Sequence, residues 1–222
     1  MADSILWEYL EELPEQEAAW REWNCRLMGW HRFNTFYAHY LRVEDRRAKL
    51  LKCTELCEHD CPLRIVENSP SDIMAVCPQA QADPIQLKFR DILIYSIRRE
   101  ALHQAICVSL NIRYSADRRH EHEHIWHLGD YSGTEFYITY RTAPAVFADT
   151  ISSLYLSCQS PFILMVPTMK NITPEMQQFI AKNKFGLLSM VDELTLQPDG
   201  SFKSVRCMTE CMNSPNRSIF TT

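Results

Sequence analysis

An uninterrupted apolar segment, residues 162–167, constrains the fold of this chain more than any other feature. Its sequence has no polar face, which is typical of a strand that is buried on both sides. Residues 143–158, before this segment, carry apolar side chains at helical spacing. After it, Thr173, Pro174 and Glu175 form a typical helix start, with a cap, a proline and an acid near the positive end of the dipole. Strands joined through helices pair in parallel, so we expect a small mixed α/β sheet here.

The surrounding sequence supplies the rest of this sheet. Residues 89–112 have a helical composition, and the polar segment before residue 124 leads into alternating strands. The strand-like segments are residues 125–128, 136–141, 187–196 and 202–205. We therefore assign residues 81–208 to one α/β domain and residues 209–222 to a polar tail.

The N-terminal part of the chain has a different character. Aromatic and aliphatic residues recur at helical spacing from residue 4 to residue 50, in three stretches that begin near residues 6, 20 and 33. We expect a helical region over residues 1–52, and hence an α+β class for the whole chain. Its broad aromatic face either packs on the core or forms a partner groove, in which Trp23 and Trp30 would be the binding residues.

Cysteines and prolines mark the next segment, residues 53–80. Two extended stretches, residues 63–67 and 72–77, flank a turn, which predicts a β-hairpin with a cysteine near each outer end. Zinc prefers four tetrahedral ligands, and thiolates spaced by a few residues are typical of structural sites. The candidate ligands for a structural zinc are Cys53, Cys57, Cys61 and Cys77, with His59, Cys207 and Cys211 as alternatives. Reduced structural thiols explain the same pattern, and a redox role is a third possibility.

A run of alternating histidines and glutamates follows at residues 120–124. In an extended chain, His120, His122 and His124 project to one side and could bind a metal. The alternatives are a solvated charged loop and a pH-sensitive interaction surface. With Asp130 and Glu135, the run suggests a metal-dependent hydrolase or nuclease, but Glu135-Phe136-Tyr137 lacks the lysine of the E-x-K string that such nucleases carry.

Charge narrows the choice of partners. The formal net charge is −5, which disfavours binding to a polyanion such as nucleic acid. Basic residues do cluster around residues 42–52, where Arg46 and Arg47 are candidate binding residues, and again at Arg98 and Arg99. We expect no secretory signal and no membrane span, and we expect a cytoplasmic protein whose cysteines are reduced.

No set of residues in the sequence is sufficient for a reaction. The leading hypothesis is therefore a non-enzymatic interaction or regulatory protein, stabilised by a structural zinc, that acts within a protein complex or, less favoured, a protein–nucleic acid complex. The alternatives are the hydrolase described above and a thiol redox sensor.

Overall fold

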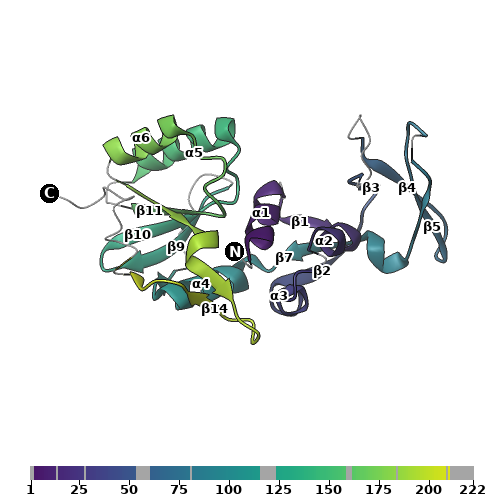
Figure 1. Cartoon of the computed structure of the whole chain (residues 1–222), viewed down its shortest axis with the longest axis horizontal. Helices are drawn as coiled ribbons and strands as arrows, with labels where there is room; N and C mark the ends of the chain where they lie inside the picture. The colour runs from purple at the N-terminus through teal and green to yellow at the C-terminus, as the bar shows by residue number, and fades with distance from the viewer. Residues whose placement is uncertain are drawn as a thin grey trace.

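The computed structural model describes residues 3–13, 15–27, 29–53, 61–80, 82–115, 124–158, 162–183, 185–208 and 210. Helices and small sheets alternate along an elongated molecule, which confirms the α+β class (Figure 1). The helices are α1 (Ser4–Glu12), α2 (Trp20–Leu27), α3 (Phe33–Tyr40), the 3-10 turn η1 (Phe89–Ile92), α4 (Arg99–Leu110), α5 (Pro144–Ser157), α6 (Pro174–Lys182) and α7 (Met190–Glu193). Within the described ranges, none of them has the length and apolar character that crossing a bilayer requires.

The strands form four sheets. They are β1 (Glu17–Ala19), β2 (Leu41–Arg47), β3 (Leu50–Leu51), β4 (Leu63–Ser69), β5 (Asp72–Val76), β6 (Ile85–Leu87), β7 (Leu93–Ile97), β8 (Arg113–Tyr114), β9 (Trp126–Tyr131), β10 (Thr134–Ile138), β11 (Phe162–Val166), β12 (Gly186–Ser189), β13 (Leu194–Leu196) and β14 (Phe202–Ser204). The sheet orders are β12-β11-β10-β9-β8, β3-β4-β5-β6, β1-β7-β2 and β13-β14.

The five-stranded sheet is the centre of the α/β half. Strand β11 pairs in parallel with both β10 and β12, which confirms the predicted parallel pair around α5. Helices α5 and α6 cover one face of this sheet, and α4 lies on the other side (Figure 1). All five residues of β11 are buried, as its unbroken apolar sequence predicts.

The arm is the four-stranded sheet β3-β4-β5-β6 at the opposite end of the molecule (Figure 1). Strands β4 and β5 pair in antiparallel register, so the predicted hairpin is confirmed. One face of the arm packs on a small core that includes Leu51, Leu63, Ile73 and Leu87.

Helices α1, α2 and α3 surround the three-stranded sheet β1-β7-β2, the middle sheet, and α1 also connects it to the α/β half. The Asp3 carboxylate accepts a hydrogen bond from the backbone nitrogen of Leu196, at 2.9 Å. The Glu11 carboxylate accepts one from the hydroxyl of Thr168, at 2.7 Å, and another from that of Thr142. Helix α1 therefore lies over the ends of the parallel strands β10 and β11.

Three expectations about elements were wrong. The third helix ends at Tyr40 rather than near Leu50, because the following residues pair with β7 as strand β2. Residues 93–97 are likewise strand β7, rich in aromatic and β-branched residues, and α4 begins only at Arg99. The expected strand over residues 187–196 is interrupted by α7.

These differences also move the boundary of the α/β half. Strands β6 and β7 lie inside the predicted domain of residues 81–208, but they pair with strands of the arm and of the middle sheet. The α/β half therefore begins at α4 rather than at residue 81.

Candidate functional site

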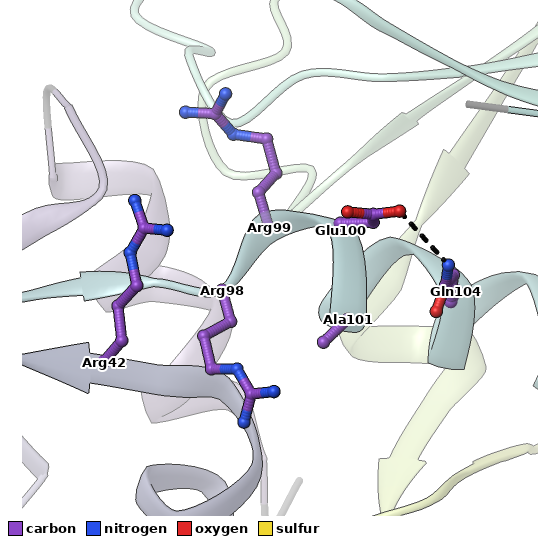
Figure 2. Close-up of a pocket in the computed structure, with 6 residues that line it drawn as sticks. All are labelled: Arg42, Arg98, Arg99, Glu100, Ala101 and Gln104. Carbon is purple, nitrogen blue, oxygen red and sulfur yellow. Dashed lines mark hydrogen bonds between the residues drawn. The ribbon is translucent and has the colours of Figure 1, made fainter. Parts of the chain in front are cut away.

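A groove of about 340 Å³ lies where the edge of the middle sheet meets the start of α4 (Figure 2). Three arginines border it: Arg42 from β2, and Arg98 and Arg99 from the point where β7 passes into α4. The other lining residues are Glu100, Ala101 and Gln104. The described lining therefore combines three guanidinium groups with a single carboxylate and no nucleophile.

Strand pairing brings these arginines together. Strand β2 runs antiparallel to β7, with Arg42 opposite Ser96 and Leu41 opposite Ile97. The backbone nitrogen of Arg98 then donates to the Tyr40 carbonyl at 2.7 Å, where the chain leaves the sheet. Arg42, from the first basic cluster of the sequence, thus lies near Arg98 and Arg99, from the second.

Helix α4 is anchored by its apolar side, which leaves its first turn at the groove. Leu102, Ile106 and Leu110 recur every four residues and are buried. The helix ends at Asn111 in the left-handed conformation, at φ 56°. At the other end, Arg98 is the N-cap residue and no side chain caps the helix. The first-turn amides of α4 therefore have no capping acceptor among the described side chains.

Arg42 is the arginine whose charge is balanced. Its Nε donates to the Glu44 carboxylate at 2.9 Å and to the Ser96 hydroxyl at 3.1 Å, while that hydroxyl also donates to Glu44. The Ser96 hydrogen bond, and then the Arg42 one, lower the pKa of Glu44, so this carboxylate stays ionised.

Arg98 is the cation with the least compensation. Its Nη1 donates to the His39 carbonyl at 3.2 Å, and it forms no ion pair with a carboxylate in the described part of the chain. It stands at the positive end of the α4 dipole, where a cation is unfavourable by about 0.3–1 kcal/mol at an exposed position. In Figure 2, Glu100 points towards Gln104, which donates to it at 3.5 Å, rather than towards Arg42.

Arg99 connects the groove to the interior. Its Nε donates to the side-chain oxygen of Gln16 at 3.1 Å, and its guanidinium carbon lies 4.3 Å from the centre of the Trp126 ring. Below it, the rings of His103 and Tyr140 stack at 6.1 Å and are buried. Burial, and then the Arg99 charge, lower the pKa of His103 to about 3, so its imidazole is neutral beneath the groove.

The binding residues predicted from the sequence lie elsewhere. Trp23 and Trp30 are 0% and 6% exposed, and their indole nitrogens donate to the Tyr95 carbonyl and to Asp3. They belong to the core, which is the first of the two interpretations of the aromatic face given above, and are not accessible to a partner. Arg46 and Arg47 are exposed but pair with Glu17 at 2.5 Å and with Glu67 at 2.9 Å. Neither arginine lines the groove.

The proposed zinc ligands lie at the base of the arm. Cys53 and Cys77 are buried in the arm core, and Cys61 packs against the same core. Cys57, His59 and Cys211 fall outside the described residues, and Cys207 is exposed on the α/β half. Among the residues that the structure places, no three His, Cys, Asp or Glu side chains form a group that could hold a metal.

The remaining cysteines behave as apolar residues. Cys25, Cys107 and Cys158 are free thiols, and Cys107 is fully buried. Burial raises the pKa of Cys107 to about 12 and also raises that of Cys158, so both stay protonated and unreactive near neutral pH.

The carboxylates considered for a nuclease are adjacent, because Asp130 and Glu135 face each other across β9 and β10. Asp130 accepts two hydrogen bonds from Arg113, at 2.6 and 3.0 Å, and Glu135 bonds to His127. Each carboxylate is thus engaged by a basic side chain. His120 and His122 lie outside the described residues, and His124 is half-buried just before β9.

Comparisons with known proteins add nothing to this geometry: no family model, curated protein or solved structure matches the chain.

The sequence contains one signal for the groove, the adjacent cations Arg98 and Arg99. Its significance becomes clear only when the start of α4 is known. The sequence predicts a helix over residues 89–112 and suggests a break in it at Arg98-Arg99-Glu100, but it does not show that the helix begins there. Once the helix is known to begin at Arg99, the two arginines stand against its dipole. The neighbouring Arg42 could be found only from the pairing of β2 with β7.

Proposed function

We propose that this chain is a non-enzymatic interaction protein that binds an anionic side chain of a protein partner in the arginine-lined groove. The observation that carries the proposal is the position of Arg98, a cation without an ion-pair partner among the described residues, at the uncapped positive end of α4. An anion bound there would interact with the guanidinium groups and with the first-turn amides of the helix.

The size of the groove supports a protein partner over a nucleic acid. About 340 Å³ accommodates one charged group and its neighbours, whereas a nucleic acid needs a track of cations along its phosphates. Arg46 and Arg47, which could extend such a track along β2, are neutralised by Glu17 and Glu67. The net charge of −5 also repels a polyanion.

Fluorescence anisotropy tests this proposal with two labelled probes of equal charge, a glutamate-rich peptide and a short single-stranded oligonucleotide. We expect the peptide to bind more tightly, and Arg98→Ala to weaken it by about tenfold, the usual loss for one charged hot-spot contact. The matched control is Lys182→Ala, which removes an exposed cation from the last turn of α6. Equal binding by the Arg98 variant, or tighter binding of the oligonucleotide, would show that the proposal is wrong.

A structural zinc at the base of the arm is a second proposal. It is supported by the position of Cys53, Cys61 and Cys77 around one small core, since a sheet with so small a core benefits from a metal crosslink. Metal analysis of the purified chain should find about one zinc per molecule, lost in Cys61→Ser and kept in His122→Ala. A chain without zinc, or loss of the metal in His122→Ala, would contradict it.

We also propose that the protein works in the cytoplasm. Free thiols at Cys25 and Cys107 support this proposal.

A further inference from the structure

A hydroxyl cradle lies at the carboxyl ends of the parallel strands β10 and β11, and consists of Thr142, Thr168 and Asn171. The two threonines follow β10 and β11 along the chain, and both are buried. The Thr142 hydroxyl donates to Oε1 of Glu11, and the Thr168 hydroxyl donates to Oε2 at 2.7 Å. Open α/β sheets bind ligands beyond the carboxyl ends of their strands. In this chain, a carboxylate of the chain itself fills that position.

Both hydroxyl protons of the cradle are directed at this carboxylate by hydrogen bonds from the protein. The Asn171 amide donates to the Thr142 hydroxyl at 3.0 Å. The backbone nitrogen of Lys170 donates to the Thr168 hydroxyl at 3.2 Å. A threonine hydroxyl has one proton, so an oxygen that accepts a bond from the protein keeps its proton for another acceptor. Two protons held in this way fit the two oxygens of one carboxylate.

The rim of the cradle carries basic side chains. The loop after β10 brings Arg141, whose guanidinium donates to the Glu15 carboxylate at 2.8 Å. The loop after β11 brings Lys170, which is exposed. Glu11 places a negative charge between these two loops, since it is bonded to a threonine from each. Its removal would therefore leave the cradle more positive, and another anion would be attracted there.

The Glu11 side chain can leave the cradle without the helix that carries it. Glu11 lies in the last turn of α1 and is partly exposed. Helix α1 is anchored instead by Leu6, Trp7 and Leu10, each of which is 0% exposed. Rotation about the side-chain bonds of Glu11 is therefore sufficient to turn its carboxylate out to solvent.

The next parallel strand offers a polar group that Glu11 does not use. Ser189 is the last residue of β12 and pairs with Val166 of β11. Its hydroxyl is buried and has no hydrogen-bond partner among the described residues. Beside it, the backbone nitrogen of Val191 donates to the Pro167 carbonyl at 3.1 Å, next to Thr168. Because buried polar groups are normally satisfied, this hydroxyl indicates that Glu11 fills only part of the sheet edge.

We infer that the hydroxyl cradle is a binding site for a carboxylate ligand, and that Glu11 fills it as an internal competitor. The two oxygens of the ligand accept from the Thr142 and Thr168 hydroxyls once the Glu11 carboxylate has turned out. The class of ligand follows from the group already held there, which engages both hydroxyls through one oxygen each. This site is separate from the groove at α4 and does not depend on the proposed function.

Titration of the full chain with acetate, followed by thermal unfolding, tests the inference. Glu11→Ala lacks the internal competitor, so acetate should bind it at least about tenfold more tightly than it binds the unmodified chain. Acetate should also raise the Tm of this variant, whereas sodium chloride at the same ionic strength should not. The matched control is Glu12→Ala, which removes the neighbouring glutamate that pairs with Arg26 at the surface, and should behave as the unmodified chain. Adding Thr168→Val to Glu11→Ala removes one donor and should weaken acetate binding by about tenfold.

Three results would overturn the inference. The first is a folded Glu11→Ala chain whose Tm responds to acetate no more than to chloride. The second is an acetate response of equal size in Glu12→Ala, because Glu11 would then not be the occupant that competes. The third is a response that Thr168→Val leaves unchanged, because acetate would then bind elsewhere. If Glu11→Ala does not fold alone, acetate should restore its near-ultraviolet circular dichroism where chloride does not, and recovery in neither salt would also overturn the inference.

Discussion

The five-stranded sheet and the arm sheet have similar lengths of strand but opposite relations to solvent. Elements pack on both faces of the first, and every residue of β11 is buried between two cores. In the described part of the chain, the arm sheet has a core on one face only, and leaves Leu50 and Val66 exposed on the other. Among the described residues, the five-stranded sheet has elements on both faces, whereas one face of the arm sheet is exposed. The two sheets should therefore respond differently to substitution.

The largest expected effect contrasts one residue of each sheet. Phe136 on β10 is fully buried, so Phe136→Ala should lower the free energy of unfolding by about 3–5 kcal/mol. Val66→Ala, on the exposed face of the arm sheet (the outer arm face), should change it by less than about 0.5 kcal/mol. Urea denaturation followed by tryptophan fluorescence measures both. A large loss in the Val66 variant would mean that the outer arm face is covered in solution.

The second prediction concerns the inner side of the arm. Ile73 is fully buried there, so Ile73→Ala should cost about 2–5 kcal/mol. Because the arm has its own small core, we expect this loss to appear first as faster amide hydrogen exchange in β4 and β5, with little change in β11. Equal acceleration in β11 would show that the two sheets unfold as one cooperative unit, and the division between them would then be wrong.

The third prediction uses pH to probe the α/β half alone. The pKa of His103 is lowered from 6.5 to about 3, mainly by burial, so its protonation favours the unfolded chain. Its effect is absent above about pH 6.5, and below that pH it removes stability by about 1.4 kcal/mol per pH unit, or about 2 kcal/mol by pH 5. Urea midpoints measured from pH 7 to pH 5 should fall less in His103→Gln than in the unmodified chain. His31→Gln, at an exposed position, is the control and should keep the full slope.

The smallest expected effect is a helix cap. The Thr173 hydroxyl accepts a hydrogen bond from the backbone nitrogen of Met176 at 3.3 Å. Thr173→Ala should therefore destabilise the α/β half by about 1 kcal/mol. The matched control is Ser152→Ala, which changes an exposed hydroxyl in the middle of α5 and should have little effect in thermal unfolding. If both variants lose stability by a similar amount, the loss in Thr173→Ala is not due to the missing helix cap.

Sequence patterns predicted the parts of the fold that depend on local chemistry. The apolar run of β11, the Thr173 cap and the hairpin of β4 and β5 each carry their signal within a few residues. The wrong predictions concern segments whose secondary structure is decided by pairing with a strand that is distant in the sequence. Residues 41–47 follow a helix directly and alternate only weakly, and they become a strand because β7 lies beside them.

The prediction of binding residues from the sequence is limited in the same way, as the groove shows. Both arginine clusters were visible in the sequence, but only the register between Arg42 and Ser96 shows that they are neighbours. Trp23 and Trp30 illustrate the converse, because aromatic periodicity alone does not distinguish a core from a groove.

The hydrogen bonds of α1 to distant segments have a consequence for folding during synthesis on the ribosome. Asp3 and Glu11 are bonded to Leu196 and Thr168, so α1 is translated before these partners. Until they emerge, the large apolar side chains of α1 have no complete surface to cover them. Helix α1 should therefore dock completely only after residues 168 and 196 have emerged.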